Sequence, residues 1–164
     1  MKRFFLAAVL ALTATLPARA EEAIVTYKSL APDVAFDLAR AALNQCRKDG
    51  YQVAVAVLDR FGIPLVVLRD QFAGPLALRV AINKAKTAAA FATSTGDFGK
   101  RIQAGELSQD YKRLPNVVTL GGGIVIEAGG AKLGAVGVSG SPGGDKDEAC
   151  AEAGLAAVRD KLDF

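Results

Sequence analysis

The sequence predicts a single α+β domain, in which helices flank an antiparallel sheet in the order α-ββ-αα-ββ-α. Two observations predict it. Two pairs of short runs rich in β-branched residues are each joined by a glycine-containing turn, which is typical of β-hairpins. Segments with apolar residues at helical spacing precede, separate and follow these pairs. Helices segregated from hairpins indicate an antiparallel sheet rather than a parallel βαβ fold.

The first half of the chain begins with a polar lead-in and continues with a helix and a hairpin. Pro32 suits a first helical turn, where its missing N–H donor costs nothing, and Gly50 is placed to end that helix. Gly62 closes a four-residue turn between two Val-rich strands. The expected elements are an edge strand at Ala23–Tyr27, a helix from Pro32 to Gly50, and strands at Tyr51–Leu58 and Ile63–Leu68.

The second half repeats the pattern with an alanine-rich helix, whose small side chains allow a close approach to its neighbour. A polar connection, Gly105–Asn116, precedes the second hairpin. The expected elements are a helix from Gly74 to about Thr93, a short helix at Asp97–Ala104, strands at Ile124–Glu127 and Leu133–Ser139, and a final helix with an apolar stripe of Ala151, Leu155, Val158 and Leu162.

Residues 1–20 read as a cleaved secretory signal, so that the domain would span residues 21–164. Lys2 and Arg3 precede an apolar run too short to cross a bilayer, and Ala18-Arg19-Ala20 fits a small-x-small cleavage site. We therefore expect a periplasmic or secreted protein with no membrane attachment after cleavage. Loss of three basic residues would leave 17 basic against 17 acidic residues, which gives no indication of a nucleic-acid partner.

The 164 residues include no histidine, which excludes whole classes of site. A Ser-His-Asp triad, a Cys-His dyad and any histidine-bearing metal site cannot form. The glycine-rich second half also lacks the spacing of a phosphate loop or a dinucleotide-binding motif. We therefore predict no catalytic residues and favour ligand binding over catalysis.

Two cysteines, Cys46 and Cys150, lie near the end of the first helix and near the start of the last one. If these helices pack antiparallel, the two ends are neighbours, and an exported protein meets oxidising conditions in which disulfides persist. We predict a disulfide, the alternative being two small buried apolar residues.

Polar residues on the second helix suggest a ligand-binding face. Lys84, Thr87, Phe91 and Thr95 fall within about a quarter of the helical circumference, which suits a flat acidic molecule, although a solvated edge beside the core explains them equally well. The loop Ser139–Asp145 offers backbone donors to an anion, the alternative being ordinary helix capping by Asp145 or Ser141. Further carboxylate clamps could come from Arg69, Arg79 and Arg113.

Five segments, in this order along the chain, together resemble the GlcG/HbpS family of small haem-binding-type proteins, a domain also found at the C-terminus of PduO-type corrinoid enzymes. They are Val55–Asp59 with Gly62, Ala81–Ala88, Gly121–Gly123, Leu133–Gly140 and Asp147–Gly154. The resemblance implies a profilin-like fold, higher homo-oligomers and, in secreted members, binding of haem or a related tetrapyrrole. This chain departs from the family at the first turn, where Phe61 stands before Gly62 instead of a glycine.

With the resemblance, the leading hypothesis is an exported, non-catalytic protein for haem or another planar anionic cofactor. The expected binding residues are Lys84, Thr87, Phe91, Thr95, Tyr111, Arg113, Gly122, Gly123, Ser139 and Gly140. Because histidine is absent, we expect Tyr111 or Thr95 to hold any haem iron. The alternatives are an oligomeric accessory subunit with a periplasmic dehydrogenase as partner, and an enzyme that degrades haem or acts on a small acid.

Overall fold

The computed structural model, which describes residues 24–162, confirms the α+β class and the two hairpins. Four antiparallel strands form one sheet in the order β2-β1-β4-β3. Pairing of β1 with β4, in which Val55 lies opposite Val138, joins the two hairpins into that sheet. The strands are β1 (Ala54–Asp59), β2 (Pro64–Arg69), β3 (Gly123–Ala128) and β4 (Ala131–Ser139).

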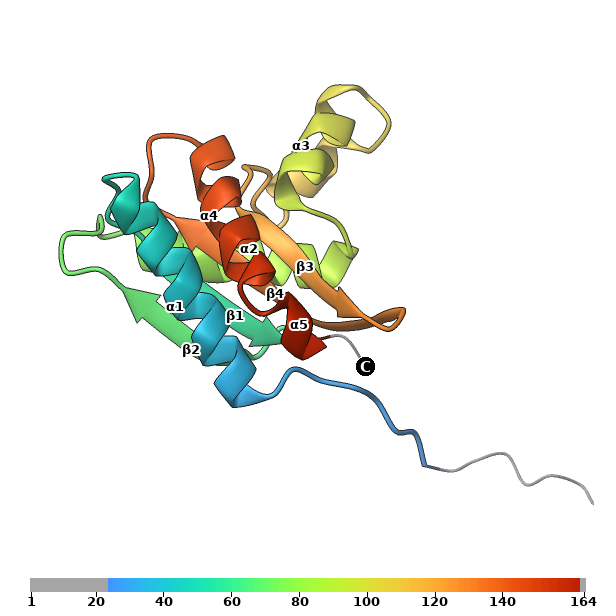
Figure 1. The fold of residues 1–164 in the computed structure, drawn as a ribbon. Helices are drawn as coiled ribbons and strands as arrows, with labels where there is room; N and C mark the ends of the chain where they lie inside the picture. Colours follow the sequence, from blue (N-terminus) through green and yellow to red (C-terminus); the bar gives the residue numbers. More distant parts are fainter. Residues whose placement is uncertain (1–23, 163–164) are drawn as a thin grey trace, which may run out of the picture.

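Helices cover both faces of the sheet (Figure 1). The helical elements are α1 (Pro32–Lys48), α2 (Ala77–Phe91), α3 (Thr95–Gln103), the short 3-10 helix η1 (Gln109–Arg113), α4 (Gly144–Ala156) and α5 (Arg159–Leu162). The pair α1 and α4 packs on one face and α2 on the other, while α3 projects beside α4. The sheet is therefore the middle layer of three.

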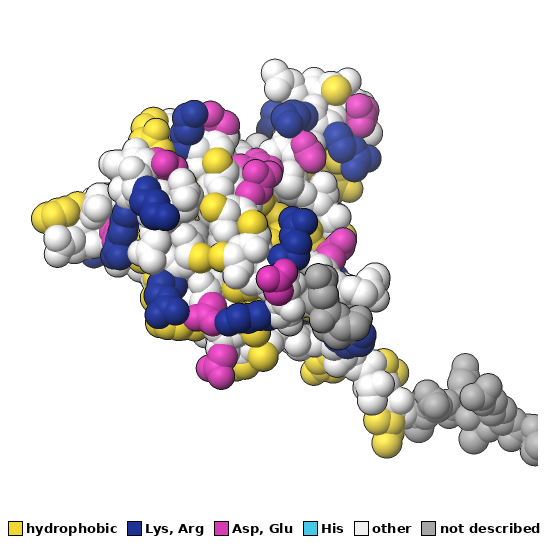
Figure 2. All heavy atoms as spheres, viewed as in Figure 1, with side chains coloured by type: hydrophobic (Ala, Val, Ile, Leu, Met, Phe, Trp, Pro, Cys, Tyr) yellow, Lys and Arg dark blue, Asp and Glu magenta, His cyan; other side chains and the backbone are white. Residues whose placement is uncertain are grey.

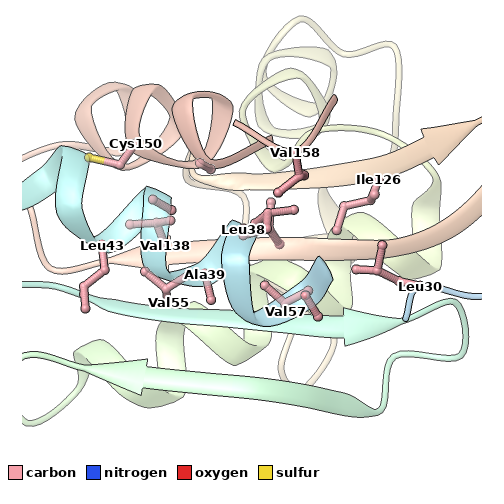
Figure 3. Close-up of a cluster of buried hydrophobic side chains, with 14 of the residues drawn as sticks. Leu30, Leu38, Ala39, Leu43, Val55, Val57, Ile126, Val138, Cys150 and Val158 are labelled. Carbon is pink, nitrogen blue, oxygen red and sulfur yellow. The ribbon is translucent and has the colours of Figure 1, made fainter. Parts of the chain in front are cut away.

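The larger core lies between the sheet and the α1/α4 layer (Figure 3). Alternate residues of β1 point to opposite faces, so that Val55 and Val57 meet Leu38 of α1 while Ala54 and Ala56 face α2. Burial of each such Val or Leu side chain stabilises the fold by roughly 1.5–3 kcal/mol. This side supplies most of the apolar burial.

The α2 side of the sheet is lined by small residues, as the alanine-rich sequence predicts. Ala81 and Ala85 of α2 are fully buried against Ala56 and Ala135. A Cβ on Gly137 of β4 would lie 2.7 Å from the backbone nitrogen of Ala85, so only glycine admits the helix at this distance. Because α2 lies so close to the sheet, a long side chain on α2 can reach the helical layer on the other face.

A disulfide joins Cys46 of α1 to Cys150 of α4, as predicted. The Sγ–Sγ distance is 2.07 Å and the Cα–Cα distance is 5.5 Å. The link lies at the end of α1 and in the second turn of α4, on the helical layer that covers the larger core.

Several boundaries differ from the sequence prediction; the first strand of the first hairpin, for example, begins at Ala54 and not at Tyr51. Residues 24–30 form no strand, because Ile24 and Val25 are 80% and 82% exposed and no buried face sets a pairing register. The second helix ends at Phe91, since Ala92 adopts a left-handed conformation with φ of +49°. The final helix breaks into α4 and α5 after Ala156, although Val158 and Leu162 are still buried.

The predicted signal peptide, residues 1–20, lies outside the described part of the chain. Within residues 24–162, no helix combines the length and the apolar character that a bilayer crossing requires.

Candidate functional site

A hollow of about 590 Å³ opens where α3, the segment 119–121 and the start of α4 meet. We call it the glycine hollow because four of its lining residues are glycines. The residues that line it are Gly96, Gly99, Lys100, Gln103, Lys112, Thr119, Leu120, Gly121, Gly144, Asp145 and Glu148.

The glycines allow three backbones to meet at the floor of this hollow. A Cβ on Gly144 would lie 2.7 Å from the backbone nitrogen of Gly121, and one on Gly99 would lie 3.2 Å from the backbone carbonyl carbon of Thr119. Side chains at these positions would force α3, α4 and the connecting segment apart. The floor is consequently backbone, which a flat molecule can approach closely.

Thr95 fixes the segment that forms one wall. Its Oγ1 donates a hydrogen bond to the carbonyl of Leu120 at 2.7 Å and accepts one from the Gly123 amide at 2.9 Å. The side chain is fully buried, at the first position of α3, which Ser94 caps by accepting from the Asp97 amide. The prediction that Thr95 lies on the second helix is therefore wrong, and its hydroxyl would have to leave both partners to bind iron.

Lys84 reaches from α2 to α4 inside the protein. Its Nζ lies 2.6 Å from Oδ2 of Asp147 and donates to the carbonyl of Val138 at 3.0 Å, and the residue is 2% exposed. The other carboxylate oxygen of Asp147 accepts from the Ser141 amide at 3.1 Å. Lys84 thus connects α2 to β4 and α4. Its ammonium does not face solvent as a ligand-binding cation would.

The loop before α4 differs from the capping expected of Asp145 or Ser141. Gly143 is the N-cap of α4, and no side chain supplies a capping hydrogen bond there. Ser141 donates through Oγ to the carbonyl of Gly143 at 2.8 Å instead. Because Asp147 already accepts from the Ser141 amide, that backbone donor is engaged within the protein.

Thr87 and an aromatic cluster hold the connection between α2 and β3. Oγ1 of Thr87 donates to the Asn83 carbonyl at 2.8 Å and accepts from the Val118 amide at 3.0 Å. Phe91 stacks on Phe98 with ring centroids 4.4 Å apart, and the Tyr111 ring meets both at 5.4 Å. Thr87 and Thr95 therefore anchor the same segment, residues 117–123, from its inner side.

The predicted binding residues lie in four separate places. Lys84, Thr87, Thr95, Gly122, Gly123 and Ser139 lie along the inner side of the segment 117–123 or next to Val138, whereas Phe91 and Tyr111 belong to the aromatic cluster. Arg113 is exposed and ion-paired with Asp110 at 2.8 Å. Gly140 packs on the backbone of Gln52 and Val53. None of the ten lines the glycine hollow itself.

The proposed arginine clamps do not converge. Arg69 donates to the Ala73 carbonyl at 2.8 Å at the end of β2, Arg79 is exposed on α2, and Arg113 pairs within η1. None of these three side chains lines the glycine hollow.

The sequence analysis missed Lys100, Lys112, Thr119 and Glu148, which do line the hollow. Part of the signal was present, since Gly96, Gly99, Lys100 and Gln103 recur at spacings of three and four and so share one face of a helix. The position of Glu148 opposite that face depends on the tertiary packing of α4 against α3, and no local pattern reveals it.

Charges at the glycine hollow are divided between its sides. Lys100 and Lys112 come from α3 and η1, and Asp145 and Glu148 come from α4; basic side chains are prominent over the α3 region, across from acidic ones over α4 (Figure 2). Lys100 is exposed and pairs with Asp97 at 3.1 Å. Such exposed pairs contribute little, so the ammonium is free to take another partner.

Glu148 and Thr119 have no side-chain hydrogen bond to any residue in the range 24–162. Both side chains could bind a metal ion through oxygen. Across the same range, no cluster of three or more carboxylate or cysteine side chains could hold a metal ion. The arrangement is suited to holding a flat molecule against backbone with its acidic groups toward two lysines.

Comparison with known proteins identifies the family of the chain. The family model described as "Haem degrading protein HbpS-like" matches residues 30–156. Protein GlcG of Escherichia coli K12 is 29% identical over 110 residues, which are 67% of this chain and 81% of GlcG.

Solved structures agree with the family model. The crystal structure of a double mutant of HbpS from Streptomyces reticuli aligns with a TM-score of 0.76 at 36% identity, over 94% of this chain and 98% of that one. The structure described as a PduOC:heme complex aligns with a TM-score of 0.72 at 28% identity, over 79% and 94% of the two chains. Given a family model that covers most of the described fold, this chain belongs to the HbpS-like family.

Proposed function

We propose that this chain is an exported, non-catalytic protein that binds haem or a related planar tetrapyrrole in the glycine hollow. The observation that carries the proposal is a hollow of about 590 Å³ with a backbone floor and two lysines on one rim. Ligand sites of this kind commonly measure roughly 300–1,000 Å³. The family description names haem, and the PduOC structure is a heme complex, which supports the choice of ligand.

The lining residues are better suited to contact the ring and the carboxylates of such a ligand than to coordinate its iron. Lys100 and Lys112 would bind its carboxylates, and the exposed side chain of Leu120 would contact the ring. The side-chain atoms around the hollow that could bind iron are lysine nitrogens and the oxygens of Gln103, Thr119, Asp145 and Glu148. Tyr111, on η1 next to Lys112, stays a predicted ligand. Bound haem iron would supply redox or oxygen chemistry, for which this chain has no histidine as a proton carrier.

Export is supported by the disulfide. Cys46 and Cys150 are bonded in the structure, and disulfides persist in oxidising compartments outside the cytosol. Expression of the full chain in a bacterium, followed by N-terminal sequencing of the periplasmic product, tests the predicted cleavage before Glu21. Recovery of the uncleaved chain in the cytosol alone would contradict it.

Titration of the chain from residue 21 with hemin tests binding and its place. We expect a saturable Soret shift, and we expect the double variant Lys100→Ala/Lys112→Ala to bind at least tenfold more weakly because it loses both cations of the rim. Lys48→Ala/Arg79→Ala is the matched control, since both cations are exposed and neither lines the hollow. Absence of a Soret shift in the parent chain would contradict the function, and equal binding by the two double variants would contradict the site.

Haem degradation is the second candidate, favoured by the wording of the family description. The same complex, supplied with a reductant and oxygen, separates the two functions. A binding protein loses at most a stoichiometric amount of chromophore, whereas an enzyme continues to consume hemin added in excess.

We also propose that the chain self-associates. Edge strand β2 and the loop after it expose large apolar side chains, with Val67, Phe72 and Leu76 at 38%, 77% and 59% exposure. Clusters of exposed apolar side chains are typical of interaction surfaces. Light scattering coupled to size exclusion should show an oligomer that Phe72→Ser/Leu76→Ser dissociates, and a monomeric parent chain would contradict the proposal.

A further inference from the structure

A second hollow, of about 440 Å³, lies beside the outer surface of α2 and shares no lining residue with the glycine hollow. We call it the basic hollow because its charged lining residues are all cations. It is lined by Arg60, Phe61, Gly62, Ile63, Lys86, Ala89, Ala90 and Lys132.

The three cations converge from separate parts of the chain. Arg60 belongs to the β1–β2 turn, Lys86 to α2 and Lys132 to β4. None of the three forms an ion pair with another residue of the described range 24–162. No carboxylate among these described residues lines the hollow. Asp59, in the same turn as Arg60, accepts from two turn amides, and Glu127 is exposed on β3 opposite Lys132.

The turn that presents Arg60 and Phe61 is internally fixed. Oδ1 of Asp59 accepts from the Phe61 and Ile63 amides at 2.8 and 2.9 Å, and Gly62 adopts φ of +80°, a conformation that favours glycine. The Arg60 guanidinium lies 5.3 Å from the Tyr27 ring centroid and 5.8 Å from that of Phe61. A cation positioned on aromatic rings in this way loses little freedom when it binds an anion.

Lys132 has a structural part in the same hollow. Its Nζ donates to the carbonyl of Ala89, in the last turn of α2, at 2.6 Å. This contact offsets the partial negative charge at the helix end, which would otherwise oppose an anion. Arg60 donates through Nη1 to the Lys28 carbonyl at 3.1 Å and keeps its other N–H donors. Arg60 and Lys86 are then the pair of cations that a ligand can bind, with exposed apolar surface from Phe61 (61%) and Ile63 (60%) beside them.

We infer that the basic hollow binds a small organic anion, in which a carboxylate or phosphate group lies between Arg60 and Lys86 and an apolar body packs on Phe61 and Ile63. Cations that line one hollow without a carboxylate partner repel one another, and a bound anion removes that cost while forming charge-assisted hydrogen bonds. The apolar wall gives preference to an aromatic or aliphatic acid over a bare oxyanion.

Amide chemical shifts of the chain from residue 21, titrated separately with benzoate, benzamide and inorganic phosphate, test the inference. Benzoate should shift the amides of Gly62 and Lys86 in a saturable way that weakens with added salt. Benzamide, which has the same shape without the charge, should not, and phosphate should bind at least tenfold more weakly than benzoate. Equal shifts with benzamide, phosphate binding as tight as benzoate, or no shift with benzoate would each overturn it.

Variants locate the site. Arg60→Gln/Lys86→Gln should weaken benzoate binding at least tenfold, whereas Lys48→Gln/Arg79→Gln, which removes two exposed cations outside the hollow, should leave it within twofold. The inference does not rest on haem binding, and the Arg60/Lys86 variant should titrate with hemin like the parent chain. Benzoate binding that survives in the Arg60/Lys86 variant would overturn the assignment.

Discussion

Lys84 and Asp147 form an interior ion pair, 2.6 Å between Nζ and Oδ2, that connects helices lying on opposite faces of the sheet. The residues are 63 positions apart, and their side chains are 2% and 5% exposed. The ion pair lies next to Gly122, the residue before β3. A Cβ on Gly122 would lie 2.9 Å from Nζ of Lys84. Absence of a side chain at this glycine therefore makes the connection between α2 and α4 possible.

Replacement of one partner should be costly. Lys84→Met leaves the Asp147 carboxylate buried with only the Ser141 amide as donor, and such a break costs about 3–5 kcal/mol in the free energy of unfolding. Urea denaturation measures the loss. Lys86→Met, on the exposed side of the same helix, is the control and should stay within about 0.5 kcal/mol of the parent chain.

The double variant Lys84→Met/Asp147→Leu separates a lost interaction from an uncompensated charge. Because both charged groups are gone, we expect it to be more stable than Lys84→Met alone. A Lys84→Met variant as stable as the parent chain would contradict an interior role for the pair and would return Lys84 to the candidates for ligand binding.

Gly122→Ala should destabilise the chain by more than about 2 kcal/mol. Gly122 adopts φ of +113°, and its Cβ would overlap the Asp147 side chain at 2.6 Å. Gly74→Ala is the matched control, since no atom lies within 4 Å of its Cβ position and its φ is not positive. Thermal unfolding of both variants measures the difference, and equal melting temperatures would contradict the close approach described for Gly122.

The fold could be predicted because its signals are local. Pro32, Gly50 and Gly62 stand at element boundaries in both the sequence and the structure, and the alternation in β1 sorts valines and alanines onto opposite faces. Ala92 is the instructive failure. An alanine with φ of +49° ends α2 and turns the chain into α3. A run of alanine and threonine contains no residue type that predicts a left-handed conformation. That single conformation moved Thr95 from the expected face to a buried anchor.

The candidate site could be predicted only in part, because it is formed by contacts between distant segments. The sequence predicts Lys84 as a ligand-binding residue, yet it pairs with Asp147 inside the protein, and an acidic residue in a first helical turn ordinarily interacts with the helix dipole instead. Glu148 enters the glycine hollow only because α4 packs against α3. Such pairings depend on the layer arrangement, and the arrangement follows from the whole chain.

Removal of the disulfide should destabilise the chain by roughly 2–5 kcal/mol, because the bond closes a loop with a sequence separation of 104. Cys46→Ala/Cys150→Ala, whose alanines suit fully buried positions, should lower the urea midpoint of unfolding. Reduction of the parent chain with dithiothreitol should bring its midpoint to a similar value. An oxidised parent chain whose stability matches the double variant would contradict a stabilising role for the link between α1 and α4.

Acid should selectively weaken the contact between α1 and α5. A hydrogen bond from the Lys161 ammonium, 2.7 Å from Asp37, is the main reason that the pKa of Asp37 is lowered from its ordinary value of 3.8. A carboxyl whose pKa is lower in the folded state adds stability above its unfolded pKa, and that stability is lost as the pH falls through the folded pKa. Lys161→Met should therefore be less stable than the parent chain near neutral pH.

The difference between these two chains should shrink as the pH falls below about 3.8, where Asp37 becomes protonated first in the unfolded and then in the folded state. Urea unfolding at a series of pH values from 7 to about 2 measures it. Lys48→Met, which removes an exposed lysine at the other end of α1, provides the baseline. A Lys161→Met difference that is constant with pH would show that Lys161 acts through packing of its carbon chain and not through Asp37.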